Sequence, residues 1–143
     1  GSCFLDLFAG TGAVGIEALS RGARKVMFVE INRLALELIR QNLALTGFLE
    51  SAKVYPLDVL CALSLLQRKG ERFDLIFLGA PYDSPILEKS LSKIAETNLL
   101  RNDGLLVVEH RKQHAVEALY GKLRNFRNQR YGETVLSFYR ASL

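Results

Sequence analysis

The 143-residue chain is 49% hydrophobic and 24% charged, the balance of a globular protein with one hydrophobic core. No apolar run approaches the roughly 20 residues of a membrane-spanning helix, and the first residues lack a secretory-signal pattern, which argues against a membrane-embedded or secreted class. Cys3 and Cys61 lie in apolar stretches with no partner at metal-ligand spacing. We therefore expect buried free thiols and a cytoplasmic protein.

The net charge of +4 is concentrated near the C-terminus. Residues 111–143 contain 7 Lys and Arg against 2 Asp and Glu, whereas residues 1–110 contain 12 against 13. A basic end on a neutral body suits a polyanionic partner. A solvated surface accounts for the same counts equally well.

Apolar runs that alternate with segments of helical periodicity predict a single α/β domain over residues 1–143. The expected strands are Cys3–Phe8, Val26–Glu30, Ala52–Tyr55, Phe73–Leu78 and Leu105–Glu109. Such runs, apolar on both faces, are typical of a buried parallel sheet. Helices are expected at 13–21, from Asn32 to Gly47 with Leu34, Leu38 and Leu45 on one face, at Val59–Arg68, and after Ser84-Pro85. This order predicts a mostly parallel, doubly wound sheet with right-handed crossovers.

The pattern changes after Glu109. We expect a helix near 114–121 and then two strands, roughly Arg124–Arg130 and Thr134–Tyr139, joined at Tyr131-Gly132-Glu133. Adjacent strands with so short a connection pair antiparallel. The sheet is therefore expected to end in an antiparallel hairpin.

A glycine-rich turn directly follows the first strand. Glycines in this position let the backbone approach a ligand and leave helix N–H groups pointing at it. Glu30 ends the second strand 20 residues beyond Gly10, where its carboxylate can accept from both hydroxyls of a ribose. The alternative for Glu30 is a surface acid at a strand end. The residues of the turn and the acid before it that we expect to contact a cofactor are Asp6, Phe8, Ala9, Gly10, Thr11 and Gly12.

Three further residues are candidates for the adenine end of that cofactor. Ile31 can lie against the ring, and Asp58, with Val59 beside it, can accept from the adenine amino group. For Asp58 a helix N-cap is an equally good reading. The turn and Glu30 suit NAD as well as S-adenosylmethionine. Asp6 favours the methyl donor because it can meet an ammonium group, which NAD lacks, and no dehydrogenase acid–base pair is apparent.

The fourth strand ends in Gly79, Ala80, Pro81 and Tyr82. Ligands bind at the carboxyl edge of an open α/β sheet, so these residues are the candidate catalytic segment. A tyrosine there can stack on a base that has been extruded from its helix.

Several fragments together resemble one known family. They are Leu5-Asp-Leu-Phe-Ala-Gly-Thr-Gly-Ala, Glu17-Ala-Leu-Ser-Arg-Gly-Ala23, Phe28-Val-Glu30, Phe73-Asp-Leu-Ile-Phe-Leu78, Val107-Val-Glu-His110 and Tyr131-Gly-Glu-Thr-Val-Leu-Ser-Phe-Tyr139. Their order and spacing resemble the RsmD family, which methylates N2 of a guanine in bacterial small-subunit (16S) ribosomal RNA. The resemblance implies a Rossmann-like class I methyltransferase fold, S-adenosylmethionine as cofactor, and ribosomal RNA or the small ribosomal subunit as partner.

Two departures from the family pattern bear on activity. The family has Asp-Pro-Pro-Tyr where this chain has Gly79-Ala80-Pro81-Tyr82, and the family's Asp accepts a hydrogen bond from the target amine. The loss of one such positioning bond costs roughly 10²–10³ in rate. Family members also carry an N-terminal extension that engages RNA. A catalytically impaired module that binds cofactor or RNA is therefore the alternative, with an NAD-dependent oxidoreductase as a weaker rival.

The remaining expectations concern partners. His110, Arg111 and Lys112 lie near the substrate edge and are the candidate RNA contacts, although a solvated surface is an equal alternative for the two cations. His110 and His114 are four residues apart, but a strand boundary falls at His110, so we expect no metal site. We expect a monomer.

Overall fold

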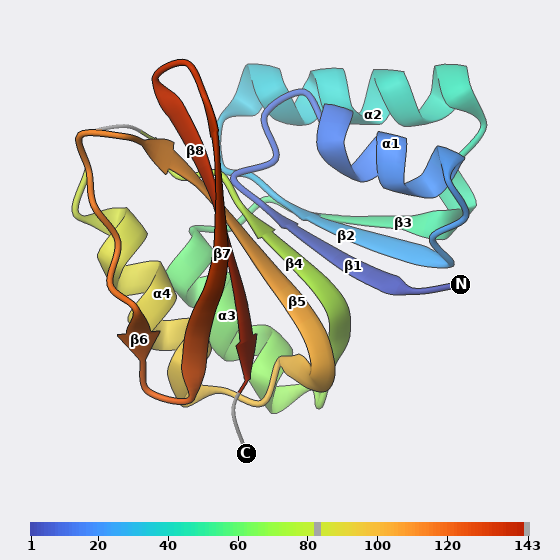
Figure 1. The fold of residues 1–143 in the computed structure, drawn as a ribbon. Helices are drawn as coiled ribbons and strands as arrows, with labels where there is room; N and C mark the ends of the chain where they lie inside the picture. The colour runs from blue at the N-terminus through green and yellow to red at the C-terminus, as the bar shows by residue number, and fades with distance from the viewer. Residues whose placement is uncertain (82–83, 142–143) are drawn as a thin grey trace.

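The chain forms a twisted sheet between two pairs of helices. A computed structural model describes residues 1–81 and 84–141 (Figure 1). The helices are α1 (Ala13–Ser20), α2 (Arg33–Thr46), α3 (Val59–Arg68) and α4 (Ile86–Glu96), with a short 3-10 turn, η1 (Leu49–Ser51). The strands are β1 (Cys3–Leu7), β2 (Lys25–Val29), β3 (Ala52–Tyr55), β4 (Phe73–Leu78), β5 (Leu100–Arg111), β6 (Leu119–Tyr120), β7 (Leu123–Tyr131) and β8 (Thr134–Ala141).

Within the described residues the strands form one sheet in the order β3-β2-β1-β4-β5-β8-β7-β6. The pairs from β3 to β5 are parallel, whereas β8 joins β5 antiparallel and pairs with β7 in a hairpin. This confirms the predicted mostly parallel sheet with an antiparallel C-terminal hairpin. Because β1, β2 and β4 are parallel, their carboxyl ends meet at one edge of the sheet.

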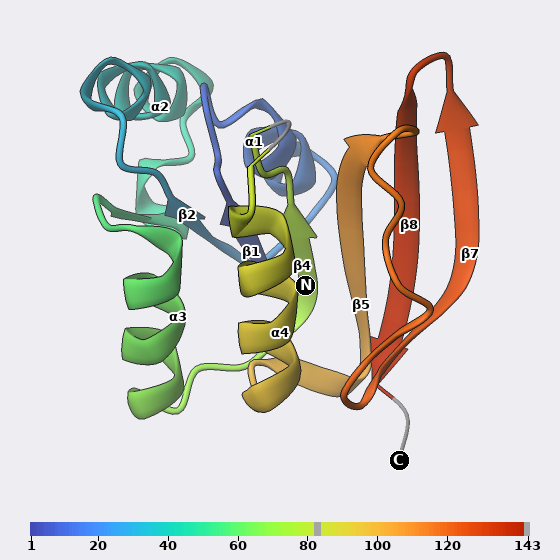
Figure 2. The ribbon, with the colours of Figure 1, turned by 90° about the vertical axis from the view of Figure 1, so that its left-hand side faces the viewer.

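Helices cover both faces of the parallel strands (Figures 1 and 2), and each face has its own hydrophobic cluster. On the face covered by α1 and α2, Phe4, Val26 and Phe28 of the sheet form a cluster with Ile39 and Leu43 of α2. On the opposite face Leu5, Leu7, Met27, Ile76 and Leu78 pack against α3 and α4. All five residues of β1 are buried, as a central strand covered on both faces requires.

Two details of the helices differ from the sequence-based expectation. In α2 the buried positions are Leu36, Ile39 and Leu43, whereas the stripe of Leu34, Leu38 and Leu45 faces solvent. In α3 the apolar face turns inward and leaves Cys61 exposed, so the prediction of a buried thiol is wrong for Cys61 and right for Cys3. None of the helices in residues 1–81 and 84–141 combines the length and apolarity of a membrane span.

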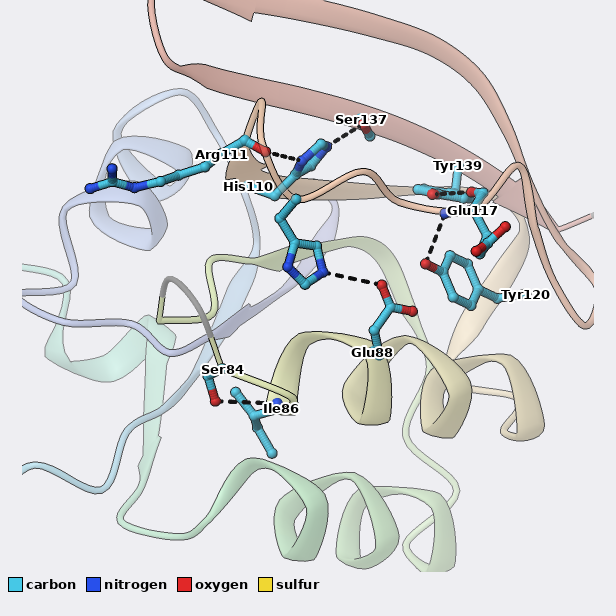
Figure 3. Close-up of polar contacts among 10 residues, drawn as sticks. Ser84, Ile86, Glu88, His110, Arg111, Glu117, Tyr120, Ser137 and Tyr139 are labelled. Carbon is cyan, nitrogen blue, oxygen red and sulfur yellow. Dashed lines mark hydrogen bonds and ion pairs between the residues drawn. The ribbon is translucent and has the colours of Figure 1, made fainter.

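The predicted helix near 114–121 is wrong. Residues 112–118 form turns and irregular backbone and lead into β6. The Tyr139 hydroxyl donates to the Glu117 carbonyl at 2.6 Å, and the Glu117 N–H donates to the Tyr120 hydroxyl at 2.9 Å (Figure 3). The rings of Tyr120 and Tyr139 also pack at 5.8 Å between centroids. These contacts hold the segment against the sheet and outweigh its local helical preference.

Candidate active site

The turn between β1 and α1 has the backbone of a ligand-binding loop. Gly10 and Gly12 have φ of 59° and 83°, and Phe8 has φ of 60°, which is rare for a residue with a side chain. Backbone strain of this kind is concentrated at binding sites. Gly15 serves packing instead, because a Cβ there would lie 2.3 Å from the Phe28 ring. The sequence therefore lets α1 approach β2 closely and leaves the turn open at Gly10.

Glu30 fixes this turn to the end of β2. Its Oε1 accepts from the Gly10 N–H at 2.8 Å, and its Oε2 accepts from the N–H groups of Ile31 at 3.0 Å and Asn32 at 2.9 Å. A carboxylate has about four acceptor positions, so these bonds leave capacity for a ligand hydroxyl. Glu30 is therefore not merely a surface acid. It organises the glycine turn.

The residues expected at the adenine end differ in exposure. Asp58 caps α3, with Oδ1 accepting from the N–H groups of Leu60 at 2.9 Å and Cys61 at 3.2 Å, so the N-cap reading is confirmed. In the described part of the chain, no bond is made to its Oδ2, which can still accept from an amine. Ile31 is 66% exposed, whereas Val59 is buried in the core. Ile31 thus offers an apolar face to a ring, and the Val59 side chain does not.

Asp6 is buried beneath the turn, where its Oδ2 accepts from the Gly15 N–H at 3.1 Å. Burial raises the pKa of Asp6 to about 7, the Gly15 bond opposes this rise, and the nearby Glu30 charge adds to it. The carboxyl is therefore half-protonated near neutral pH. A cation placed near it would favour the ionised form.

The end of β4 lies beside β1 at the same edge. The Gly79 N–H donates to the Leu7 carbonyl at 3.4 Å, and Ala80 is buried. Tyr82 lies outside the described residues. Ala80 and Pro81 line a small pocket of about 10 Å³, which has room for about one water molecule and none for a base. Its other lining residues are Ser84, Leu87, Glu109, His110, Arg111 and His114.

The three residues expected to contact RNA already have partners within the chain. His110 is 5% exposed; its Nε2 lies 2.7 Å from Ser137 Oγ and its Nδ1 lies 3.0 Å from the Arg111 carbonyl (Figure 3). Since a carbonyl only accepts, Nδ1 carries the proton of the neutral imidazole, and in that tautomer Nε2 accepts from Ser137. Lys112 pairs with Glu133 at 3.1 Å, and Arg111 is also engaged. A direct RNA contact from His110 would require this arrangement to change.

Sequence reasoning missed a basic, aromatic surface on the C-terminal hairpin. In the β7–β8 register Arg124 is opposite Arg140 and Arg127 is opposite Phe138, and opposed residues share a face of the sheet. Arg127 lies 5.5 Å from the centroid of the Phe138 ring, and Arg140 lies 4.9 Å from that of Phe126. No acid in the described chain pairs with any of these three arginines. We call Arg124, Arg127, Arg140, Phe126 and Phe138 the arginine face.

The only sequence signal for this face was the C-terminal charge excess. The excess did not indicate which side of the sheet carries the cations. A bulge between Asn125 and Arg127 shifts the register and determines that Arg127 joins Arg124 on one face.

A larger open groove lies between α3 and α4, with a volume of about 690 Å³. It is lined by Cys61, Ser64, Glu88 and Lys93, among others, and contains none of the predicted cofactor, catalytic or RNA-contacting residues. Its place between two helices, rather than at the carboxyl edge of the sheet, separates it from the glycine turn.

Comparison with known proteins places the chain in a family. Residues 1–140 match the family model described as Conserved hypothetical protein 95. YlbH of Bacillus subtilis, provisionally named an rRNA methyltransferase, is 36% identical over 136 residues, which span 95% of this chain and 74% of YlbH. Ribosomal RNA small subunit methyltransferase D of Haemophilus influenzae is 37% identical over 109 residues, which span 76% of this chain but only 56% of that protein.

Solved structures agree. A Haemophilus influenzae protein described provisionally as a methylase superposes with a TM-score of 0.86 at 28% identity, covering 99% of this chain and 88% of that one. A protein described provisionally as a methyltransferase, and solved with S-adenosylhomocysteine, shares the fold alone, with a TM-score of 0.81 at 14% identity, over 99% of this chain and 45% of that one. The fold is thus that of class I methyltransferases, and the chain belongs to the Conserved hypothetical protein 95 family, the RsmD family of methyltransferases.

Proposed function

We propose that this protein transfers a methyl group from S-adenosylmethionine to the exocyclic N2 of a guanine in small-subunit ribosomal RNA, in the cytoplasm. The observation that carries the proposal is the hydrogen bond between Glu30 and Gly10, which orders the glycine turn beside the end of β4. Relatives of this chain are named rRNA methyltransferases, and this supports the reaction and the substrate class.

The residues present suit this cofactor. Glu30 has acceptor capacity for ribose hydroxyls, Ile31 offers an exposed apolar face, and Asp58 retains one oxygen for the adenine amine. Asp6 supplies a negative charge near a ligand ammonium. When bound, the cofactor supplies an electrophilic methyl carbon on a sulfonium, whose thioether leaving group is neutral. The proposed contacts of Phe8, Ala9, Gly10, Thr11 and Gly12 come from the turn itself.

Positioning accounts for most of the catalysis in such a reaction, because a sulfonium is already a good leaving group. The rigid Ala80–Pro81 segment follows a buried strand and is anchored to β1 through Gly79. The pocket beside it is too small for a base, so the target is expected to bind in front of this edge, with Tyr82 as the proposed stacking group.

The arginine face is the proposed RNA contact. The three arginines have no acidic partner in the described chain, and two of them, Arg127 and Arg140, lie over the rings of Phe138 and Phe126, a combination that binds phosphates and stacks bases. Arg111, at the end of β5, is opposite Thr134, which shares a face of β8 with Phe138 and Arg140, so Arg111 extends the arginine face toward the catalytic edge. Lys112 instead lines a pocket with Asn128 and Ser137 on the other face of the hairpin. His110 supports the hairpin through its contact with Ser137 on β8.

Two measurements test the proposal. Calorimetry with S-adenosylhomocysteine and with NADH should show binding of the first alone; binding of NADH alone would exclude the methyl-donor reading. Transfer of a radiolabelled methyl group to unmethylated small ribosomal subunits should follow, with label recovered as N2-methylguanine after digestion. Label on another base would refute the assigned target atom while leaving the cofactor assignment intact.

A further inference from the structure

Gly79 poses a chemical problem for the proposed function. It stands where the resemblance places an acidic residue, and glycine has no side chain to accept a hydrogen bond from the target amine. Nothing in the backbone demands glycine at this position. Its φ is not in the left-handed region, and the nearest atom that a Cβ there would meet belongs to the Phe77 ring, at an ordinary 3.5 Å.

A carboxylate from the neighbouring strand reaches the same place. The Glu109 Oε1 lies 4.0 Å from the point where the Cβ of residue 79 would stand. The register explains this approach: Leu78 pairs with Val108 in the parallel β4–β5 ladder, so residues 79 and 109 follow side by side at the carboxyl edge.

Glu109 also has the environment of a ligand-facing group. It is only partly exposed, it lines the pocket beside Ala80 and Pro81, and its carboxylate has no hydrogen bond or ion pair within residues 1–81 and 84–141. The acids of the cofactor side, by contrast, accept from backbone N–H groups. Partial burial of a carboxylate without a hydrogen-bond partner destabilises the fold, unless a bound ligand supplies that partner.

We propose that Glu109 accepts the hydrogen bond from the target amine, in place of the missing side chain at residue 79. This inference rests on the proposed function. As the amine nitrogen forms its bond to the methyl carbon and the carbon–sulfur bond breaks, positive charge develops on nitrogen and its N–H groups become stronger donors. A carboxylate acceptor therefore binds the transition state more tightly than the ground state. After transfer the nitrogen releases one proton, which passes to water.

The kinetic test removes the carboxylate acceptor from residue 109 on β5 and places one at residue 79, at the end of β4. Glu109→Ala should lower kcat by on the order of 100-fold with little change in KM. Adding Gly79→Asp to Glu109→Ala should raise kcat at least about tenfold above that of the single Glu109→Ala variant. Asp103→Ala, an exposed acid near the opposite end of the same strand, is the matched control and should remain fully active. Full activity of Glu109→Ala would overturn the proposal, as would a double variant that still binds S-adenosylhomocysteine but gains nothing from Gly79→Asp.

A second test needs neither cofactor nor RNA. If Glu109 occupies the space beside residue 79, the Gly79→Asp variant places two carboxylates together, and their repulsion raises the pKa of one of them. We expect its Tm to fall by roughly 3–5 °C at pH 7 and by less at pH 4, and Glu109→Gln should remove the difference. Absence of this pH-dependent coupling would show that the two positions do not meet. Failure of the native chain to bind S-adenosylhomocysteine would instead refute the proposed function itself.

Discussion

The two ends of the sheet differ in how their charges are compensated. At the glycine turn, the acids Asp6, Glu30 and Asp58 all accept from backbone N–H groups before any ligand arrives. On the hairpin, the three arginines of the arginine face lack acidic partners in the described chain, and Arg127 and Arg140 lie over aromatic rings instead. The cofactor side is therefore preorganised, whereas the substrate side retains positive charge that a polyanion can neutralise.

The largest expected effect comes from a substitution that removes the contacts of Glu30 at the preorganised glycine turn. Glu30→Ala removes the acceptor for three N–H groups and the proposed ribose contact. Hydrogen bonds to charged groups contribute about 1.5–3 kcal/mol, so we expect the affinity for S-adenosylhomocysteine to fall by on the order of 100-fold. Calorimetry measures this directly. Glu37→Ala, an exposed acid on α2, is the control, and equal losses in both variants would contradict the assignment.

Removing charge from the other side should leave cofactor affinity unchanged and weaken RNA binding. Replacing Arg124, Arg127 and Arg140 with Gln should lower affinity for small-subunit RNA by roughly 30-fold at low salt and reduce the salt slope by about 2, since each single-strand phosphate contact contributes about 0.7. Filter binding across a salt series measures both quantities. The matched control replaces Arg40, Arg68 and Arg72, which are exposed elsewhere on the surface. An equal loss of RNA affinity in that variant would show that net charge, and not the arginine face, accounts for the change.

The raised pKa of Asp6 predicts that stability and cofactor affinity on this side of the sheet depend on pH. Because its folded pKa is raised to about 7 from 3.8, its contribution to the unfolding free energy falls as pH rises from about 4 through 7. A bound ammonium favours the ionised carboxylate, so the affinity for S-adenosylhomocysteine should rise by roughly tenfold between pH 6 and 8. Calorimetry at both values, repeated on Asp6→Asn, checks this. A persistent pH dependence in the variant would assign it to another group.

The smallest effect is expected from a substitution at Ser137, which contacts His110 and supports the hairpin. Ser137→Ala leaves Nε2 of the buried His110 without its donor and should cost about 1 kcal/mol of the free energy of unfolding in urea. We expect cofactor affinity to stay unchanged, because the pair lies on the substrate side of the sheet. A fall in that affinity would argue that the two sides of the sheet are energetically coupled.

The sequence by itself determined the parallel core, the glycine turn with its acid 20 residues on, and the C-terminal hairpin. These features follow from local periodicity, glycine placement and the length of connections, each of which depends on residues close together in the sequence. The same local reasoning misread residues 114–121, because the contacts of Tyr120 and Tyr139 that hold this segment come from β6 and from β8 at the far end of the chain.

Only the tertiary structure decided which side chains meet at the site. The approach of Glu109 to residue 79 depends on the β4–β5 register, and the gathering of three arginines on one face depends on a bulge in β7. His110, expected to contact RNA, is buried and has its polar contact with Ser137 on β8. Register and inter-strand contacts join residues far apart in the chain, so no pattern within a single strand specifies them.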